Sequence, residues 1–154
     1  MFGFFRRKIR TVADIQELLT TEGNAKAGQV LRSEADKGNH ICQIFLSQFY
    51  LDMMERETND VILKDLSEFF VRYSEMAANQ GDADTQYNLA KHLMSVASAD
   101  IRAGGGRLSE SGRDTLLNSK KYLLLAAEQG LDDAKESLSN LDELLDWAEA
   151  QEYV

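Results

Sequence analysis

Apolar residues recur every three or four positions along nearly the whole chain, which is the spacing of an amphipathic helix. No segment alternates between apolar and polar residues for long enough to predict a β-strand. The 154 residues include no proline, so the residue that most strongly breaks a helix interior is missing. The pattern therefore predicts an all-α protein of about seven helices, over residues 12–20, 25–36, 40–55, 61–79, 83–97, 114–129 and 132–150.

Two segments carry further expectations. The predicted helix over residues 40–55 is rich in large apolar side chains such as Phe49, and we expect it to be buried on more than one side. Residues 98–112 form the longest predicted loop and contain three consecutive glycines at 104–106. We expect this loop to be mobile and either idle or a partner contact, because loops longer than about 12–15 residues are usually functional or disordered.

Three glycines, Gly38, Gly81 and Gly130, divide the chain into similar segments and lie 43 and 49 residues apart. A tyrosine, a pair of alanines and a glutamine precede the second and third glycines at the same offsets, and a leucine follows each glycine by eight residues. Paired small residues let two helices approach closely, and a glycine with positive φ lets one helical hairpin turn into the next. We therefore expect stacked hairpins with alanine pairs, such as Ala126 and Ala127, in tight seams.

The residues around the second and third glycines resemble a known repeat family. The sequence GDADTQYNLA, which starts at Gly81, is similar to the first helix of a Sel-one-like repeat, a relative of the tetratricopeptide repeat. The sequences AANQG and AAEQG resemble the closing motif of that repeat, and the resemblance covers about residues 30–145. The unit from Gly81 to Gly130 is longer than is usual in the family, and the glycine that normally follows the first helix is missing after Leu51. The resemblance implies a right-handed α/α superhelix of about three stacked hairpins, which holds partner proteins on a concave surface and rarely performs chemistry.

Charge is unevenly distributed along the chain, whose 17 basic and 26 acidic residues give a net charge of −9. Cations gather in the first ten residues, at Arg6, Arg7, Lys8 and Arg10, whereas acids dominate from Asp132 onward. An acidic body repels a phosphate backbone, so we expect no nucleic-acid binding. A basic protein partner would instead be attracted. The alternative is that the acids only keep exposed helix faces solvated.

The first ten residues form a basic and aromatic segment, and residues 11–154 are expected to be a single helical-repeat domain. In this segment the phenylalanines precede the cations, which is the reverse of a secretory signal, and no run approaches the 18 or so apolar residues of a membrane span. Contact of residues 1–10 with an anionic membrane is less favoured than a frayed end or packing on the first helix. The expected location is the cytoplasm.

Residues able to carry catalysis are scarce. The chain has one cysteine, Cys42, and two histidines, His40 and His92, and it contains none of the common nucleophile, zinc or phosphate-loop motifs. Because His92 falls at a repeat position that is usually apolar, we expect it to be packed against other side chains. The sequence predicts no enzyme, no metal and no cofactor.

Positions three, six, seven and ten after each glycine lie on or near a different helix face from the leucine that closes the seam. After Gly38 these positions are largely apolar, with Ile41, Ile44 and Phe45, and a place in the core is the slightly favoured interpretation. The acids of the last helix are expected to face outward because its leucines and Trp147 turn inward. The candidate partner contacts are Asp84, Tyr87, Asn88, Lys91, Glu136, Asn140, Asp142, Glu143 and Asp146.

Two functions fit these features. The first is a non-enzymatic protein–protein interaction module that binds a partner protein or peptide on its repeat surface. The second is an immunity or neutralising protein that blocks a basic toxin or effector enzyme, which small size and acidic charge suit equally well. The identity of the partner and the oligomeric state stay open.

Overall fold

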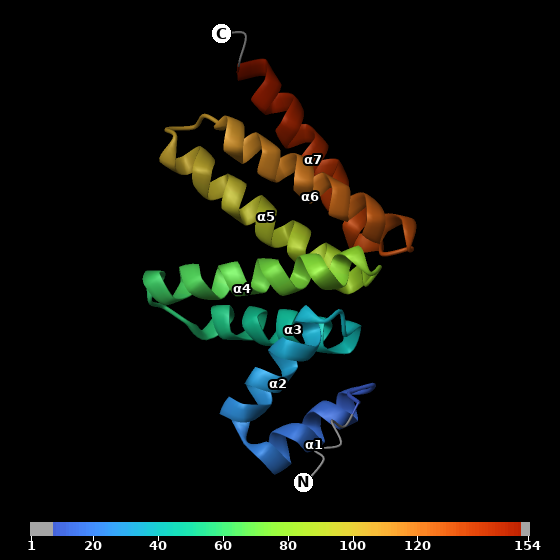
Figure 1. The fold of residues 1–154 in the computed structure, drawn as a ribbon. Helices are drawn as coiled ribbons and strands as arrows, with labels where there is room; N and C mark the ends of the chain where they lie inside the picture. The colour runs from blue at the N-terminus through green and yellow to red at the C-terminus, as the bar shows by residue number, and fades with distance from the viewer. Residues whose placement is uncertain (1–7, 152–154) are drawn as a thin grey trace. The chain divides into compact units, whose positions relative to one another are not determined.

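The computed structural model describes residues 8–151, which are α-helical except for short connections and contain no strand. The described residues form seven helices, which confirms the all-α prediction (Figure 1): α1 (Val12–Glu22), α2 (Asn24–Asp36), α3 (His40–Arg56), α4 (Asp60–Asn79), α5 (Ala83–Ala103), α6 (Glu110–Glu128) and α7 (Asp132–Gln151). Residues 1–7, which make up most of the basic and aromatic segment and of its suggested membrane contact, lie outside the described residues.

The chain forms two compact units, Met1–Ala77 and Ala78–Val154. The first unit holds α1, α2, α3 and most of α4, and the second holds α5, α6 and α7. The boundary falls inside α4, near its C-terminal end. The single helical-repeat domain over residues 11–154 stays a prediction.

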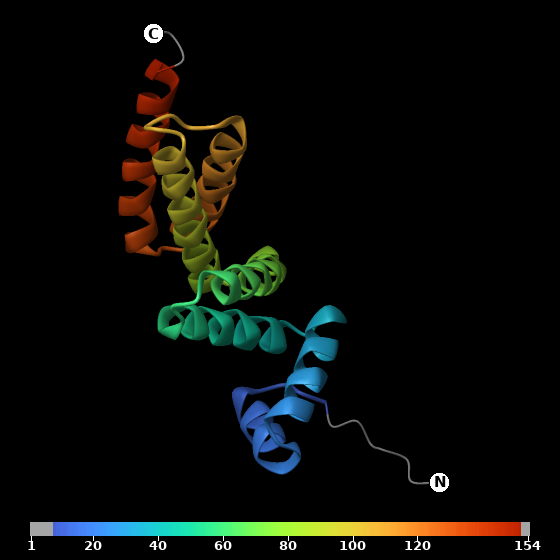
Figure 2. The same cartoon turned by 90° about the vertical axis from the view of Figure 1, so that its left-hand side faces the viewer.

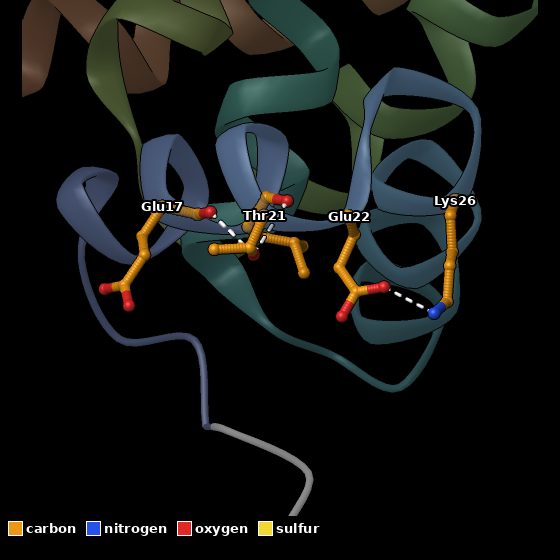
Figure 3. A network of polar contacts seen from close by, with 5 residues as sticks. Glu17, Thr21, Glu22 and Lys26 are labelled. Carbon is orange, nitrogen blue, oxygen red and sulfur yellow. Dashed lines mark hydrogen bonds and ion pairs between the residues drawn. The ribbon is translucent and has the colours of Figure 1, made fainter.

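Local side-chain contacts define the first two helices. Thr11 caps α1, because its hydroxyl oxygen accepts a hydrogen bond from the amide of Asp14 while the Asp14 carboxylate accepts one from the amide of Thr11. Near the end of α1 the Thr21 hydroxyl donates to the carbonyl oxygen of Glu17, and an ion pair joins Glu22 to Lys26 of α2 (Figure 3). The chain turns between α1 and α2 at Gly23, which has a φ of +77°, and the ion pair spans this turn.

The hairpin of α3 and α4 is held by one polar and several aromatic contacts. The hydroxyls of Ser47 and Ser74 form a buried hydrogen bond of 2.7 Å, and the rings of Tyr50 and Tyr73 stack with centroids 5.9 Å apart. The expectation that the third helix is buried on more than one side is wrong, because Phe49 is 45% exposed. The residues of α3 that are buried lie on one side of it.

In the second unit α6 packs against both α5 and α7 (Figures 1 and 2). Between α5 and α6 the Ser119 hydroxyl donates to the carbonyl oxygen of Ala90 over 2.9 Å. Three leucines from the three helices, Leu89, Leu123 and Leu141, are completely buried. The seam-closing role predicted for Leu89 is therefore consistent with its burial.

The prediction of a long loop over residues 98–112 is wrong at both of its ends. Helix α5 continues to Ala103 and α6 begins at Glu110, so the connection spans only residues 104–109. The Asp100 carboxylate accepts a hydrogen bond from the amide of Ser109 over 2.9 Å, and the Ser109 hydroxyl oxygen caps α6 by accepting one from the amide of Gly112. The small and polar residues at the end of α5 obscured its apolar periodicity, but they are helical all the same.

The repeat found in the sequence has a structural counterpart at each glycine. Gly38, Gly81 and Gly130 have φ values of +98°, +101° and +94°, and each amide donates to the carbonyl oxygen three residues earlier. Gln43 and Gln86, each five residues after a glycine, donate side-chain hydrogen bonds of 2.9 Å and 3.0 Å to a carbonyl oxygen eight residues earlier. The same local geometry is thus built twice in full, because a lysine replaces the glutamine after Gly130.

Candidate functional site

Helix α5 separates the seam residues of the repeat from the predicted partner contacts. Thr85, Gln86, Leu89 and Ala90 are buried, whereas none of the four candidates is fully buried. Of the candidates, Asp84 and Lys91 are exposed, and Tyr87 and Asn88 are half-buried. The Lys91 ammonium lies 4.5 Å from the centroid of the Tyr87 ring, within the range of a cation–π interaction. Leu89 and Ala90 are therefore more buried than the four candidates on this helix.

Helix α7 shows a similar division, with one deviation. Ala134, Leu141 and Leu145 are buried, which places these residues of α7 against the rest of the unit. Four of the five candidates on this helix are exposed: Glu136, Asn140, Glu143 and Asp146. Trp147 was expected to turn inward, but it is 38% exposed and lies beside these acids in the sequence. The solvent side of α7 therefore combines carboxylates with one large aromatic ring.

The predicted acidic surface of α7 is smaller than the sequence indicated, because two of its carboxylates pair with α6. Asp142 lies 2.7 Å from the Lys120 ammonium, and Glu149 lies 2.9 Å from the Arg113 guanidinium. These two acids help to hold α7 on α6, although half-exposed pairs of this kind stabilise a protein by only about 0–1 kcal/mol. The acids left for a partner are Glu136, Glu143 and Asp146, and Asp142 is better described as an intramolecular contact.

The candidates on α5 and those on α7 form two patches of the second unit. Within the described residues, no hydrogen bond or ion pair joins a candidate on α5 to one on α7. A hydrogen bond of 2.9 Å joins the side-chain amide of Gln129, at the end of α6, to the side-chain oxygen of Gln86 on α5. The structure therefore gives a mixed patch on α5 and an acidic patch on α7.

A third surface lies in the first unit and was only partly expected. Phe45, which belongs to the apolar positions after Gly38, stacks on Phe49 with centroids 6.4 Å apart. Phe49 contacts the ring of Tyr50, and Tyr50 stacks on Phe69 of α4 at 5.1 Å. Together with the neighbouring Met53, these side chains define what we call the aromatic face: Phe45, Phe49, Met53 and Phe69, over Tyr50.

The signal for the aromatic face was present in the sequence. Phe45, Phe49 and Met53 are spaced four residues apart, so they share one side of a helix. Their apolar character suggested burial, and the side of α3 that packs is instead formed by residues such as Leu46 and Tyr50. The contribution of Phe69, which comes from the next helix, follows only from the structure.

Two titratable groups outside these surfaces, Cys42 and His92, are uncharged at neutral pH because they are buried. Burial, with a smaller contribution from Glu34, raises the pKa of the Cys42 thiol to about 11, so this thiol is protonated at neutral pH. Burial also lowers the pKa of His92, which therefore carries a neutral imidazole at pH 7. No cluster of metal-ligating side chains occurs among residues 8–151, and no helix described here is long and apolar enough to cross a membrane.

No family model, no curated protein and no solved structure matches the chain. The resemblance to Sel-one-like repeats therefore rests on the residues that carry it. Those residues are the segment that begins at Gly81 and the alanine–glutamine–glycine motifs that end at Gly81 and Gly130.

Proposed function

We propose that the chain is a non-enzymatic interaction module that binds a partner protein or peptide on its repeat surface. The observation that carries this proposal is the division of α3 and α5 into a constant and a variable face. Positions four, five, eight and nine after the glycine are buried in both helices. The positions between them carry apolar residues on α3 and polar residues on α5. A constant packing face with a varied exposed face is typical of repeat proteins that bind other proteins.

The proposal includes the finer architecture that the Sel-one-like resemblance implies, a right-handed α/α superhelix of about three stacked hairpins. The pairs α1–α2, α3–α4 and α5–α6 would be the hairpins, and α7 would cap the last of them. The matching glycine turns support this arrangement, as does Leu138 of α7, which is only half-buried where its counterparts Leu46 and Leu89 are buried. We further propose a cytoplasmic location.

A second function is supported by the acidic patch on α7. A protein that neutralises a basic toxin or effector enzyme needs exposed carboxylates to meet the lysines and arginines of its target. Glu136, Glu143 and Asp146 are exposed, and the net charge of the whole chain is −9. The same charge disfavours nucleic acid as a partner of either function.

The interaction module is tested by capture followed by affinity measurement. The immobilised full chain is used to recover binding proteins from its native cytoplasm, and the recovered protein is purified and titrated by calorimetry. The variant Tyr87→Ser with Lys91→Ala removes the ring and the cation of the α5 patch. If this patch contacts the partner, we expect a loss of about 1 kcal/mol or more in binding free energy, since truncation of a tyrosine packed at the centre of an interface commonly has a cost of this size.

The matched control is Leu117→Ala, which removes a side chain that is exposed on α6 of the same unit. Melting temperatures of both variants are compared with that of the wild type, so that a folding defect is not read as a binding defect. Equal affinities for the wild type, the α5 variant and the control would exclude the α5 patch from the interface. A recovered protein that is consumed or modified by the chain would contradict the non-enzymatic proposal.

A further inference from the structure

A row of side chains runs along the solvent side of α7. Its members are spaced four, three and four residues apart, so they share one side of the helix. All of them are exposed, whereas Leu141 and Leu145 are buried on the opposite side of α7. We call this set the Trp147 row: Glu136, Asn140, Glu143 and Trp147.

The carboxylates of the Trp147 row are not paired with any cation among the described residues. The cations Lys120 and Arg113 of α6 pair with Asp142 and Glu149, which lie nearer the packed side of α7. Lys135, the one cation of α7 itself, pairs with a carboxylate of the first turn. Within residues 8–151, no side chain of the row makes a hydrogen bond or an ion pair. The polar groups of the row are therefore open to a partner.

The ring of Trp147 is likewise open to a cation from outside the chain. Cations of the chain lie 5.5, 4.5 and 5.0 Å from the ring centroids of Tyr73, Tyr87 and Tyr122, whereas no described cation lies over Trp147. Among the aromatic side chains, the indole ring of tryptophan attracts cations best. Glu143 lies one helical turn before Trp147, about 6 Å along the helix axis. The indole ring and the carboxylate can therefore meet the same cation.

We infer that the Trp147 row binds an arginine side chain of a basic partner protein and prefers arginine to lysine. A guanidinium group is planar, so it stacks on an indole ring while its N–H groups donate to the Glu143 carboxylate and the Asn140 side-chain oxygen. A lysine ammonium is a compact and strongly hydrated charge, and it gains less from the ring. This inference rests on the proposed neutralising function, for which it names the side chain that the α7 surface recognises.

Fluorescence titration of the full-length protein tests the inference, because Trp147 is the one tryptophan of the chain and reports on this row alone. The probes are tetra-arginine and tetra-lysine peptides with blocked ends, each titrated at low ionic strength. We expect the dissociation constant of tetra-arginine to be lower by about threefold or more. Glu143→Gln removes the charge beside the ring and should weaken the binding of tetra-arginine by about threefold or more. The matched control, Glu110→Gln, removes the same charge from an exposed position on α6 and should weaken it less.

Three results would overturn the inference: equal affinity for the two peptides, equal weakening by the two substitutions, or no saturable change in Trp147 fluorescence. A failure of the proposed function is recognised separately, with the natural partner recovered by capture. If that partner responds to loss of the Glu143 charge but the peptides show no preference, the arginine site is rejected and the neutralising function stands. If tetra-arginine binds as expected but the natural partner does not respond, the neutralising function is rejected and the arginine site stands.

Discussion

At the scale of single residues, the alanine pairs of the repeat are not equivalent. Ala77 and Ala78 are both buried, but of the later pair only Ala126 is completely buried and Ala127 is half-buried. Close packing was expected at both Ala126 and Ala127, and the structure shows it only at Ala126. It is centred on the first alanine of the later pair.

We predict that Ala126→Phe destabilises the protein by about 1–3 kcal/mol, because a ring at this position must displace packed neighbours. Ala127→Phe should cost clearly less, since part of its added ring can reach solvent. The free energy of unfolding is measured for both variants by urea denaturation followed by circular dichroism. Equal losses for the two substitutions would show that the two alanines pack alike.

His92 gives a second prediction, which concerns pH. Burial lowers its pKa in the folded protein below the ordinary value of 6.5, so the unfolded state binds a proton more readily than the folded state does. The stability associated with the neutral imidazole is fully present above pH 6.5 and is lost as the pH falls through the folded pKa. We expect the free energy of unfolding to fall between pH 7.5 and pH 5.5, a window above the range in which carboxyl groups titrate.

The variant His92→Gln removes this titration and keeps a polar side chain. Its free energy of unfolding, measured in urea at several pH values across the same window, should fall less steeply than that of the wild type. If the variant and the wild type lose stability in parallel on acidification, the pH dependence has another source.

At the scale of elements, the connection between α5 and α6 is a packed turn. The amide of Gly106 donates to the carbonyl oxygen of Ile101 over 2.8 Å, which closes the end of α5. Gly112, on the first turn of α6, is buried, and a Cβ atom there would lie 2.7 Å from a methyl carbon of Leu108 and closer still to the Asp100 carboxylate. A side chain at position 112 would therefore have to displace the Leu108 and Asp100 side chains, and a shift of Asp100 would disturb its hydrogen bond to Ser109.

We predict that Gly112→Ala destabilises the protein by about 1–3 kcal/mol, because the added methyl group collides with the carboxylate that holds Ser109. Gly28→Ala is the matched control, since Gly28 is also helical but its added Cβ would meet only the flexible Arg32 side chain at 3.4 Å. This control should stabilise α2 by about 0.5–1 kcal/mol. Thermal unfolding of both variants distinguishes a packed turn from an idle loop, and an unchanged melting temperature for Gly112→Ala would support the idle loop.

Features that depend on neighbouring residues could be predicted from the sequence, whereas contacts between residues of different helices could not. The number and order of the helices and the turns at Gly38, Gly81 and Gly130 follow from periodicity and backbone chemistry over a few residues. The pairing of Asp142 with Lys120 joins positions on different helices, and it changes which acids face a partner. Periodicity cannot report such contacts. For the same reason the apolar residues of α3 predict burial on more than one side, although Phe49 is exposed.

At the scale of the whole molecule, some of the 26 acidic side chains pair with cations of the same chain, while the net charge of −9 is unaffected by these pairs. The acids that remain exposed on α7 are the ones able to attract a basic partner, and this attraction should weaken as salt rises. The screening length falls from about 10 Å at 0.1 M ionic strength to about 3 Å at 1 M. Charge that steers a partner is therefore distinguishable from charge that only keeps a terminal helix solvated.

We predict that Glu143→Gln with Asp146→Asn weakens binding to a basic partner and reduces the dependence of the dissociation constant on salt. The control is Glu110→Gln with Asp114→Asn, which removes the same charge from exposed positions on α6. Calorimetric titration of the recovered partner at low and high salt compares both variants with the wild type. If only net charge matters, the two variants lose affinity equally. If the acidic patch contacts the partner, the α7 variant loses more, since its carboxylates approach the partner's cations most closely. Identical affinity and salt dependence in all three proteins would leave the α7 acids with a solvating role alone.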